Sequence, residues 1–145
     1  MIAAIIVAVS MILAVALFLA GIEIQVMGIR NAVKAELASL SIKISDDTYQ
    51  SLREGDFEAY RDKLNSSSSY ISALTSDFYS SLEENIKLHT ETYDIENVSL
   101  AFTNAGNSLV YTFNCDVRFR VTILGGAFPE ITRSVTIEGR HNAKY

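Results

Sequence analysis

The sequence predicts an α+β protein in which a long N-terminal helix packs, by its second half, on a three-stranded antiparallel meander. Three observations lead to this prediction: an uncharged apolar run at the start, apolar residues spaced by three or four after it, and strict alternation of apolar and polar residues near the end. Spacings of about 3.6 and 2 residues are typical of helices and strands, respectively. We expect short helices between these two parts to cover the remaining edge of the sheet.

The apolar run spans residues 1–22 and contains only Ser10 and Gly21 besides aliphatic, methionine and phenylalanine residues. As a helix it would be roughly 33 Å long, close to the roughly 30 Å hydrocarbon core of a bilayer. Because it is apolar on every side, it needs lipid or protein around it. We assign 1–28 to a transmembrane or filament-core helix.

Three interpretations of this run are open: a cleavable secretory signal, an ordinary membrane anchor, or a terminus at Met1 from which a basic leader has been removed. The third fits best, because no Lys or Arg precedes the run and signals are normally shorter. The first basic residues, Arg30 and Lys34, follow the run. Taken at face value, the positive-inside rule would place the rest of the chain in the cytoplasm.

Residues 29–44 continue the same helix in amphipathic form. Gly21 and Gly28 are its weak points, each costing up to about 1 kcal/mol in helix propensity. The apolar stripe consists of Val26, Ile29, Val33, Leu37, Leu40 and Ile44. We expect Val33, Leu37 and Leu40 to pack against the sheet.

We expect residues 45–92 to form short helices and loops. Ser45-Asp46-Asp47 is typical of a helix N-cap, and Gly55 would end the helix that follows. A second short helix is predicted over 56–64. The serine run at 66–69 can cap a third, whose apolar residues are Tyr70, Ile71, Leu74, Phe78 and Leu82.

We expect residues 93–145 to form the sheet. A first strand contains Val98, Leu100 and Phe102, and 104–107 has the composition of a hairpin turn. Every odd position from Leu109 to Ile123 is apolar, which predicts a long strand with one buried face. Gly125-Gly126 and Pro129 connect it to a third strand with Ile131, Val135 and Ile137. We expect Phe113, Val117 and Phe119 to face the long helix.

Composition excludes several kinds of site. The net charge of −5 lies outside the apolar run and argues against a nucleic-acid partner. A single cysteine, Cys115, excludes an intrachain disulfide and a cysteine-based zinc site, and its place on the apolar face predicts a buried, inert thiol. His89 and His141 stand apart from other metal-ligating residues. We therefore expect no metal, no cofactor and no enzymatic activity.

Two further features are open to two interpretations. Glu23, the first charge, either pairs with Arg30 or Lys34 of a neighbouring copy or simply marks the end of the apolar surface. The triplets that begin at Asn65 and Asn97 match the N-glycosylation pattern, which matters if the domain lies outside the cell. Such triplets also arise by chance.

The helix, bare in its first half and packed on a sheet in its second, resembles the type IV pilin family. Met1 fits the residues with which processed pilins often begin. Ile5 stands where the family usually has glutamate, and Gly21 lies nearest to the place of its usual helix-breaking proline. The resemblance is therefore to tight-adherence-type pilins, pseudopilins or archaeal-type subunits, rather than to the major pilins of the usual bacterial kind.

The resemblance implies a structural subunit that waits in the inner or cytoplasmic membrane. Filament assembly machinery would extract it into an extracellular helical homopolymer on the cell surface that serves adhesion, motility, DNA uptake or secretion. The residues expected to take part in assembly are Met1, Ile5, Ala8, Leu13, Ala16, Ala20, Gly21 and Glu23. The alternative is a single-pass membrane-anchored protein with a small α+β sensor or scaffold domain.

Overall fold

The computed structural model describes residues 1–123, 126–127 and 129–143. Its helices are α1 (Ile2–Arg53), α2 (Phe57–Lys63) and α3 (Ser69–Asn85). Its strands are β1 (Tyr93–Ala105), β2 (Ser108–Phe119), β3 (Thr122–Ile123), β4 (Gly126–Ala127) and β5 (Ile131–Asn142). The main sheet has the order β1-β2-β5 with antiparallel neighbours, so the predicted α+β class and the three-stranded meander are confirmed.

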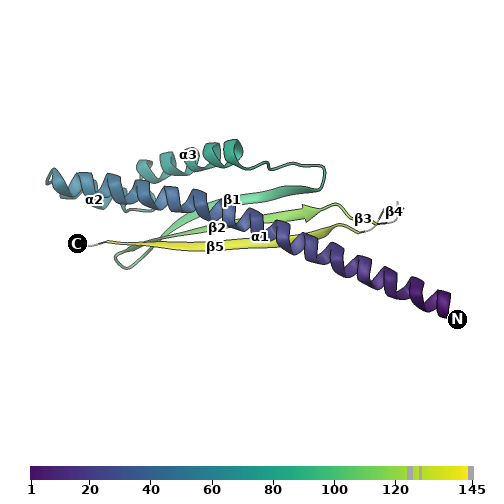
Figure 1. Cartoon of the computed structure of the whole chain (residues 1–145). Helices are drawn as coiled ribbons and strands as arrows, with labels where there is room; N and C mark the ends of the chain where they lie inside the picture. The colour runs from purple at the N-terminus through teal and green to yellow at the C-terminus, as the bar shows by residue number, and fades with distance from the viewer. Residues whose placement is uncertain (124–125, 128, 144–145) are drawn as a thin grey trace.

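One face of the sheet is covered by two helices, α1 and α3, which lie side by side in Figure 1. Phe78 of α3 meets Phe113 of β2 edge to face, with ring centroids 5.8 Å apart. The Tyr79 hydroxyl of α3 accepts a hydrogen bond from the backbone N–H of Leu100 in β1 at 2.8 Å. Helix α3 thus reaches the edge strand β1, as expected of the short helices, and also extends over β2. One helix is too narrow to cover three strands about 4.8 Å apart.

A single core cluster lies between the helices and the sheet. The six residues predicted to pack helix against sheet all belong to it and are 0–6% exposed: Val33, Leu37, Leu40, Phe113, Val117 and Phe119. On β2 the apolar odd positions are buried from Leu109 to Phe119, as the alternation predicted. The side chain of Ile123 and all of Gly125 lie outside the described residues.

The sequence predicted that the long helix ends near Ile44. In the structure it continues to Arg53. The buried stripe continues through Ile44, Thr48 and Ser51, and the Thr48 hydroxyl donates to the Ile44 carbonyl at 2.7 Å. Asp47 caps no new helix, because it lies within α1, and its carboxylate accepts a hydrogen bond from the Tyr70 hydroxyl at 2.6 Å. Continued burial thus overrides the local cap signal. Gly55, at φ +75°, follows the end of the helix.

The two short helices begin where the sequence indicated. Asp56 caps α2 by accepting a hydrogen bond from the Ala59 N–H at 2.9 Å. Ser68 caps α3 by accepting one from the Ile71 N–H at 3.3 Å. These bonds satisfy backbone donors that the first turn of a helix otherwise leaves unpaired.

The first strand is longer than predicted and contains a bulge. It begins at Tyr93, and its register with β2 shifts between Glu96 and Ser99, with Asn97 at φ +54°. The extra residue reverses the parity of the strand, so that Ile95 and Leu100 are both buried. The apolar residues over 98–102 all fall on even positions, so the sequence alone could not reveal this change of parity.

Candidate assembly interface

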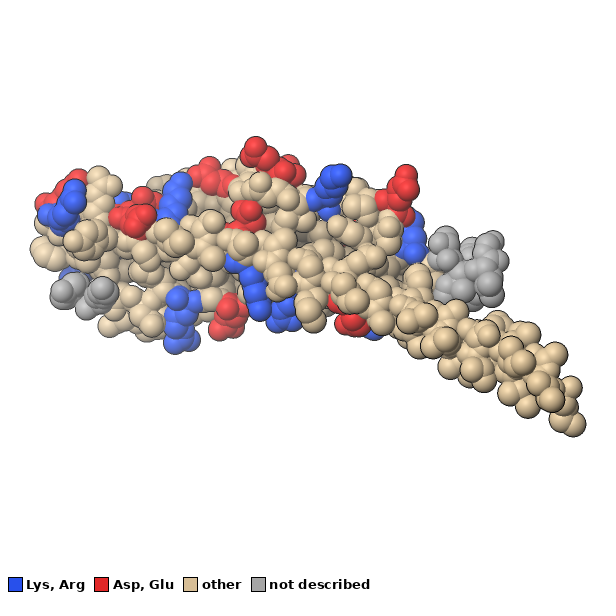
Figure 2. Space-filling view, in the orientation of Figure 1, with Lys and Arg blue, Asp and Glu red and all other residues tan. Residues whose placement is uncertain are grey.

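The first 21 residues of the chain form what we call the apolar rod, residues 1–21. The rod extends past the end of the sheet in Figure 1, and Figure 2 shows it without a charged residue. None of its residues is buried, and the first buried position of α1 is Ile22, at 3% exposed. Among the described residues, α1 is the one helix that is long and apolar enough to cross a membrane.

Most of the predicted assembly residues lie on this rod. The exposed members are Met1, Ile5, Ala8, Leu13, Ala16 and Ala20. Gly21 lies half-buried at the base of the rod, and Glu23 is exposed just beyond it. The rod brings these side chains onto one continuous surface, and what covers that surface stays a prediction.

A narrow strip along the rod carries small side chains, with Val7 and Leu17 roughly 40° to either side of it. Ala3, Ser10, Ala14 and Gly21 are separated by seven, four and seven residues. At 3.6 residues per turn these positions fall within roughly 40° of one another. The Ser10 hydroxyl donates to the Ile6 carbonyl at 2.8 Å, so it is satisfied within the helix. Another helix can approach closely along such a strip.

We call the rest of the chain, from residue 22 onward, the head. The rod joins the head at a charge pair that the sequence did not reveal. Glu23 Oε1 lies 3.0 Å from Nε of Arg133 in β5, with side chains 59% and 46% exposed. The first charge of the chain therefore has a partner within the chain, and a contact with Arg30 or Lys34 of a neighbouring copy stays a prediction. One feature of the sequence could have indicated a contact for Arg133. It is the charged member of an alternating set that is otherwise apolar, Ile131, Val135 and Ile137.

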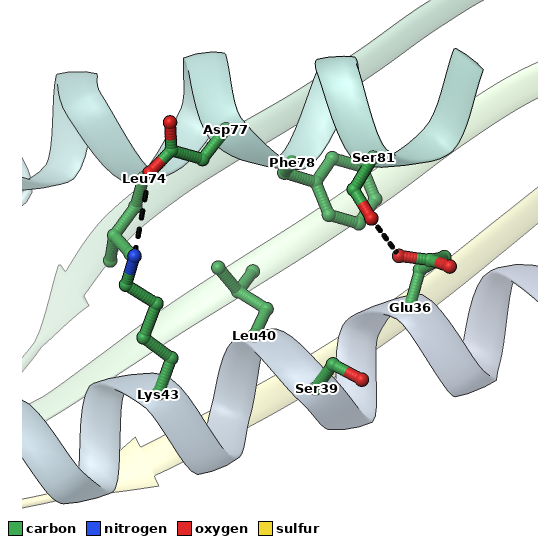
Figure 3. A pocket seen from close by; sticks show the side chains of 8 residues that line it. All are labelled: Glu36, Ser39, Leu40, Lys43, Leu74, Asp77, Phe78 and Ser81. Carbon is green, nitrogen blue, oxygen red and sulfur yellow. Dashed lines mark hydrogen bonds and ion pairs between the residues drawn. The ribbon is translucent and has the colours of Figure 1, made fainter. Parts of the chain in front are cut away.

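Helix α3 packs against the second half of α1 through apolar and polar contacts. Figure 3 shows a groove between α1 and α3 with Leu40, Leu74 and Phe78 among its lining residues. The groove also holds a Lys43–Asp77 ion pair of 3.4 Å, and the Ser81 hydroxyl donates to Glu36 at 2.7 Å. Its volume of about 140 Å³ is below the roughly 300–1,000 Å³ of small-molecule pockets. The groove is thus a helix–helix seam.

A buried carboxylate organises the loop between α3 and β1. Asp94 contacts His89 Nδ1 at 3.0 Å and pairs with the guanidinium groups of Arg118 and Arg120. Arg120 also donates to the carbonyls of Thr90 and Glu91, at 2.6 and 3.1 Å. The hydrogen bond with His89 is the main cause of an Asp94 pKa below the usual aspartate value, and both arginines lower it further against the effect of burial. This cluster holds the loop in place.

The remaining candidate residues lie apart from one another. Cys115 is buried as predicted, and burial raises the pKa of its thiol to about 11, which keeps it protonated. Within the described residues, no three His, Cys, Asp or Glu side chains gather as metal ligands would. Asn65 and Asn97 are both exposed, in different surroundings.

No protein-family model matches the chain, and neither a curated protein nor a solved structure is significantly similar to it. The architecture, a long apolar N-terminal helix packed on a three-stranded antiparallel sheet, is compatible with a pilin-like subunit. The exposed first half of that helix is compatible with a membrane span.

Proposed function

We propose that this protein is a pilin-like structural subunit that polymerises through its apolar rod into an extracellular helical filament. The observation that carries the proposal is that the rod has no buried residue yet is continuous with the core helix of the head. A helix without a break transmits its orientation to the head. Copies that bundle their rods would therefore arrange their heads in a regular way around the bundle.

The exposed rod is unfavourable in water. Burying a Val, Leu, Ile, Phe or Met side chain stabilises a protein by about 1.5–3 kcal/mol relative to exposure. The large apolar side chains exposed on the rod include Ile2, Ile5, Ile6, Val7, Val9, Met11, Ile12, Leu13, Val15, Leu17 and Leu19. Together they amount to tens of kcal/mol, so a single copy in water is not a working state.

Lipid and a bundle of rods both satisfy this surface, so moving from one to the other costs little hydrophobic energy. A bundle differs from lipid in its close packing, because small side chains let the helix backbones approach one another. The side of the rod with Ala3, Ser10, Ala14 and Gly21 supports this contact. Glu23 pairs with Arg133 of the same chain, so this carboxylate would keep a partner within a bundle of rods.

The alternative is a single-pass membrane protein whose head is a sensor or scaffold domain. The length of the rod suits a bilayer equally well. The two functions differ in what happens without detergent. Shearing intact cells that make the protein should release fibres visible by electron microscopy and containing the full chain by mass spectrometry. If the chain stays in the membrane fraction and no fibre contains it, the filament proposal fails.

A matched pair of substitutions in the rod separates shape from hydrophobicity. Ala14→Leu keeps the rod apolar but adds bulk on its small-residue side, whereas Ile12→Leu keeps both polarity and volume. Polymerisation predicts fewer or no fibres for Ala14→Leu, normal fibres for Ile12→Leu, and equal amounts of both variants in the membrane. If Ala14→Leu leaves the amount of fibres unchanged, this side of the rod does not mediate assembly.

A further inference from the structure

The two glycosylation triplets stand in opposite surroundings. We propose that Asn65, and not Asn97, is a site of N-linked glycosylation, with its glycan at the end of the head farthest from the apolar rod. The inference requires the head to lie outside the cytoplasm, but it does not require the chain to polymerise.

The Asn65 side chain presents its nitrogen to solvent. Asn65 is exposed in the loop between α2 and α3, and its Oδ1 accepts a hydrogen bond from the Ser67 N–H at 3.1 Å. This turn occupies the oxygen of the amide. Within the described part of the chain, no hydrogen bond engages Nδ2, the atom to which a sugar is attached. The hydroxyl that the triplet requires belongs to Ser67, also exposed.

The loop is held in this conformation by one side chain from the sheet. Asn104 of β1 accepts a hydrogen bond from the Ser66 N–H at 2.9 Å and donates one to the Leu64 carbonyl at 2.7 Å. Ser68, immediately after the triplet, caps α3. The triplet is therefore presented on the outside of the folded head in a fixed form.

Asn97 is also exposed, but its Nδ2 is hydrogen-bonded and it lies in a strand rather than in a loop. It lies within β1 at the bulge, and its Nδ2 donates to Asp116 Oδ2 at 2.9 Å. Asp116 also accepts from the Ser134 hydroxyl at 2.7 Å, and the two hydrogen bonds lower the pKa of its carboxyl group. A sugar on Nδ2 of Asn97 would disturb this cross-strand network, in the middle of a paired strand.

The surroundings of Asn65 leave room for a sugar. A hollow of about 340 Å³ adjoins it, and its polar lining includes Arg61, Asn104, Asn107 and Ser108. Guanidinium, amide and hydroxyl groups suit the hydroxyl groups of a first sugar unit. The hollow lies at the β1–β2 turn, at the opposite end of the molecule from the N-terminus (Figure 1). A glycan there leaves the rod clear.

The donor would be an oligosaccharide linked through phosphate to a membrane lipid, used by a transferase outside the cytoplasm. Nδ2 of Asn65 attacks the anomeric carbon, and a C–N bond forms as the C–O bond to phosphate breaks. The lipid phosphate leaves with the electron pair, and one amide proton passes to a base on the transferase. No oxidant or reductant is needed.

The test is peptide mass spectrometry on the full chain purified from its own cells. We expect a sugar mass on the Asn65 peptide and none on the Asn97 peptide. Asn65→Gln and Ser67→Ala should each abolish the modification, whereas Asn97→Gln and Ser67→Thr should retain it. Ser67→Ala keeps Asn65 and its turn, and an unchanged melting temperature would show that the fold is intact.

An unmodified Asn65, or a glycan on Asn97, would overturn the inference. The outcome is separable from that of the proposed function. Fibres built from unmodified chains would refute glycosylation alone, and a glycosylated chain that never forms fibres would refute polymerisation alone.

Discussion

Gly139→Ala offers a sharp test of how the sheet is packed. Gly139 in β5 pairs with Tyr111 in β2, and the Tyr111 ring lies across the glycine. A Cβ at position 139 would stand 2.2 Å from Tyr111 Cε2 and 2.4 Å from its hydroxyl oxygen. Tyr111 is 6% exposed and tilted against Phe102, with ring centroids 6.0 Å apart. The ring must therefore move out of a packed position.

The size of the effect follows from three contributions. Overpacking a core costs about 1–3 kcal/mol, and the aromatic pair with Phe102 is worth about 0.5–1.5 kcal/mol. Replacing glycine in a strand returns roughly 0.5–1 kcal/mol through lower backbone entropy in the unfolded chain. We expect Gly139→Ala to lower the free energy of unfolding by about 1–3 kcal/mol. The melting temperature would fall by roughly 4 °C for each of these kcal/mol.

The assay is urea and thermal unfolding of the full chain in mild detergent, followed by circular dichroism. Gly28→Ala is the matched control, because a Cβ at Gly28 meets nothing within 4 Å. In this helical position alanine should raise stability by up to about 1 kcal/mol. A second background, Tyr111→Leu, removes the part of the ring that reaches Gly139. There Gly139→Ala should be neutral or stabilising.

The reasoning fails if Gly139→Ala costs nothing in the parent chain. It also fails if the substitution costs the same with tyrosine and with leucine at position 111, because the double-mutant cycle would then show no coupling between the two residues.

Three further outcomes are expected. The folded pKa of Asp94 lies below its unfolded value, so its stabilising effect is complete above about pH 4 and is lost as the pH falls through the folded pKa. Acid titration of Asp94→Asn should lack this part of the pH dependence seen in the parent chain. Cys115 should resist alkylation at neutral pH until the chain unfolds, because its thiol is buried with a pKa raised to about 11; rapid labelling of the native chain would contradict this. Glu23→Gln should lower stability by no more than about 1 kcal/mol, and less at high salt, because the pair with Arg133 is exposed. A larger loss of stability would show that the pair with Arg133 is stronger than an exposed pair, whereas loss of fibres would assign Glu23 a contact between copies.

The features predictable from the sequence are those set by periodicity. The apolar odd positions of β2 and the stripe from Ile29 to Ile44 each repeat often enough to outweigh local exceptions. Single-residue events were not predictable in this way. The bulge at Asn97 reverses the parity of β1, and the apparent cap at Ser45-Asp46-Asp47 yields to continued burial along α1.

Contacts between residues distant in sequence were also missed. The Asp94 cluster joins residues from the α3–β1 loop, β1 and the end of β2, and Arg133 reaches Glu23 across 110 positions. Charged side chains on strands read as solvated surface unless the fold brings opposite charges together. The structure was needed to show that His89, isolated in the sequence, contacts a buried carboxylate.

The two halves of α1 differ in where their partners lie. From Ile22 onward the helix has its partners within the chain, which is why its buried stripe could be read from the sequence. Within the described residues, only Phe18 and Gly21 near the base of the rod are partly covered by the rest of the chain, so partners for most of the rod must be supplied from outside. Because the rod carries no charged side chain and its Ser10 hydroxyl is bonded within the helix, its surroundings need provide only apolar contact. Lipid and neighbouring rods would both do so, and the proposed function therefore requires no change in this helix between membrane and filament.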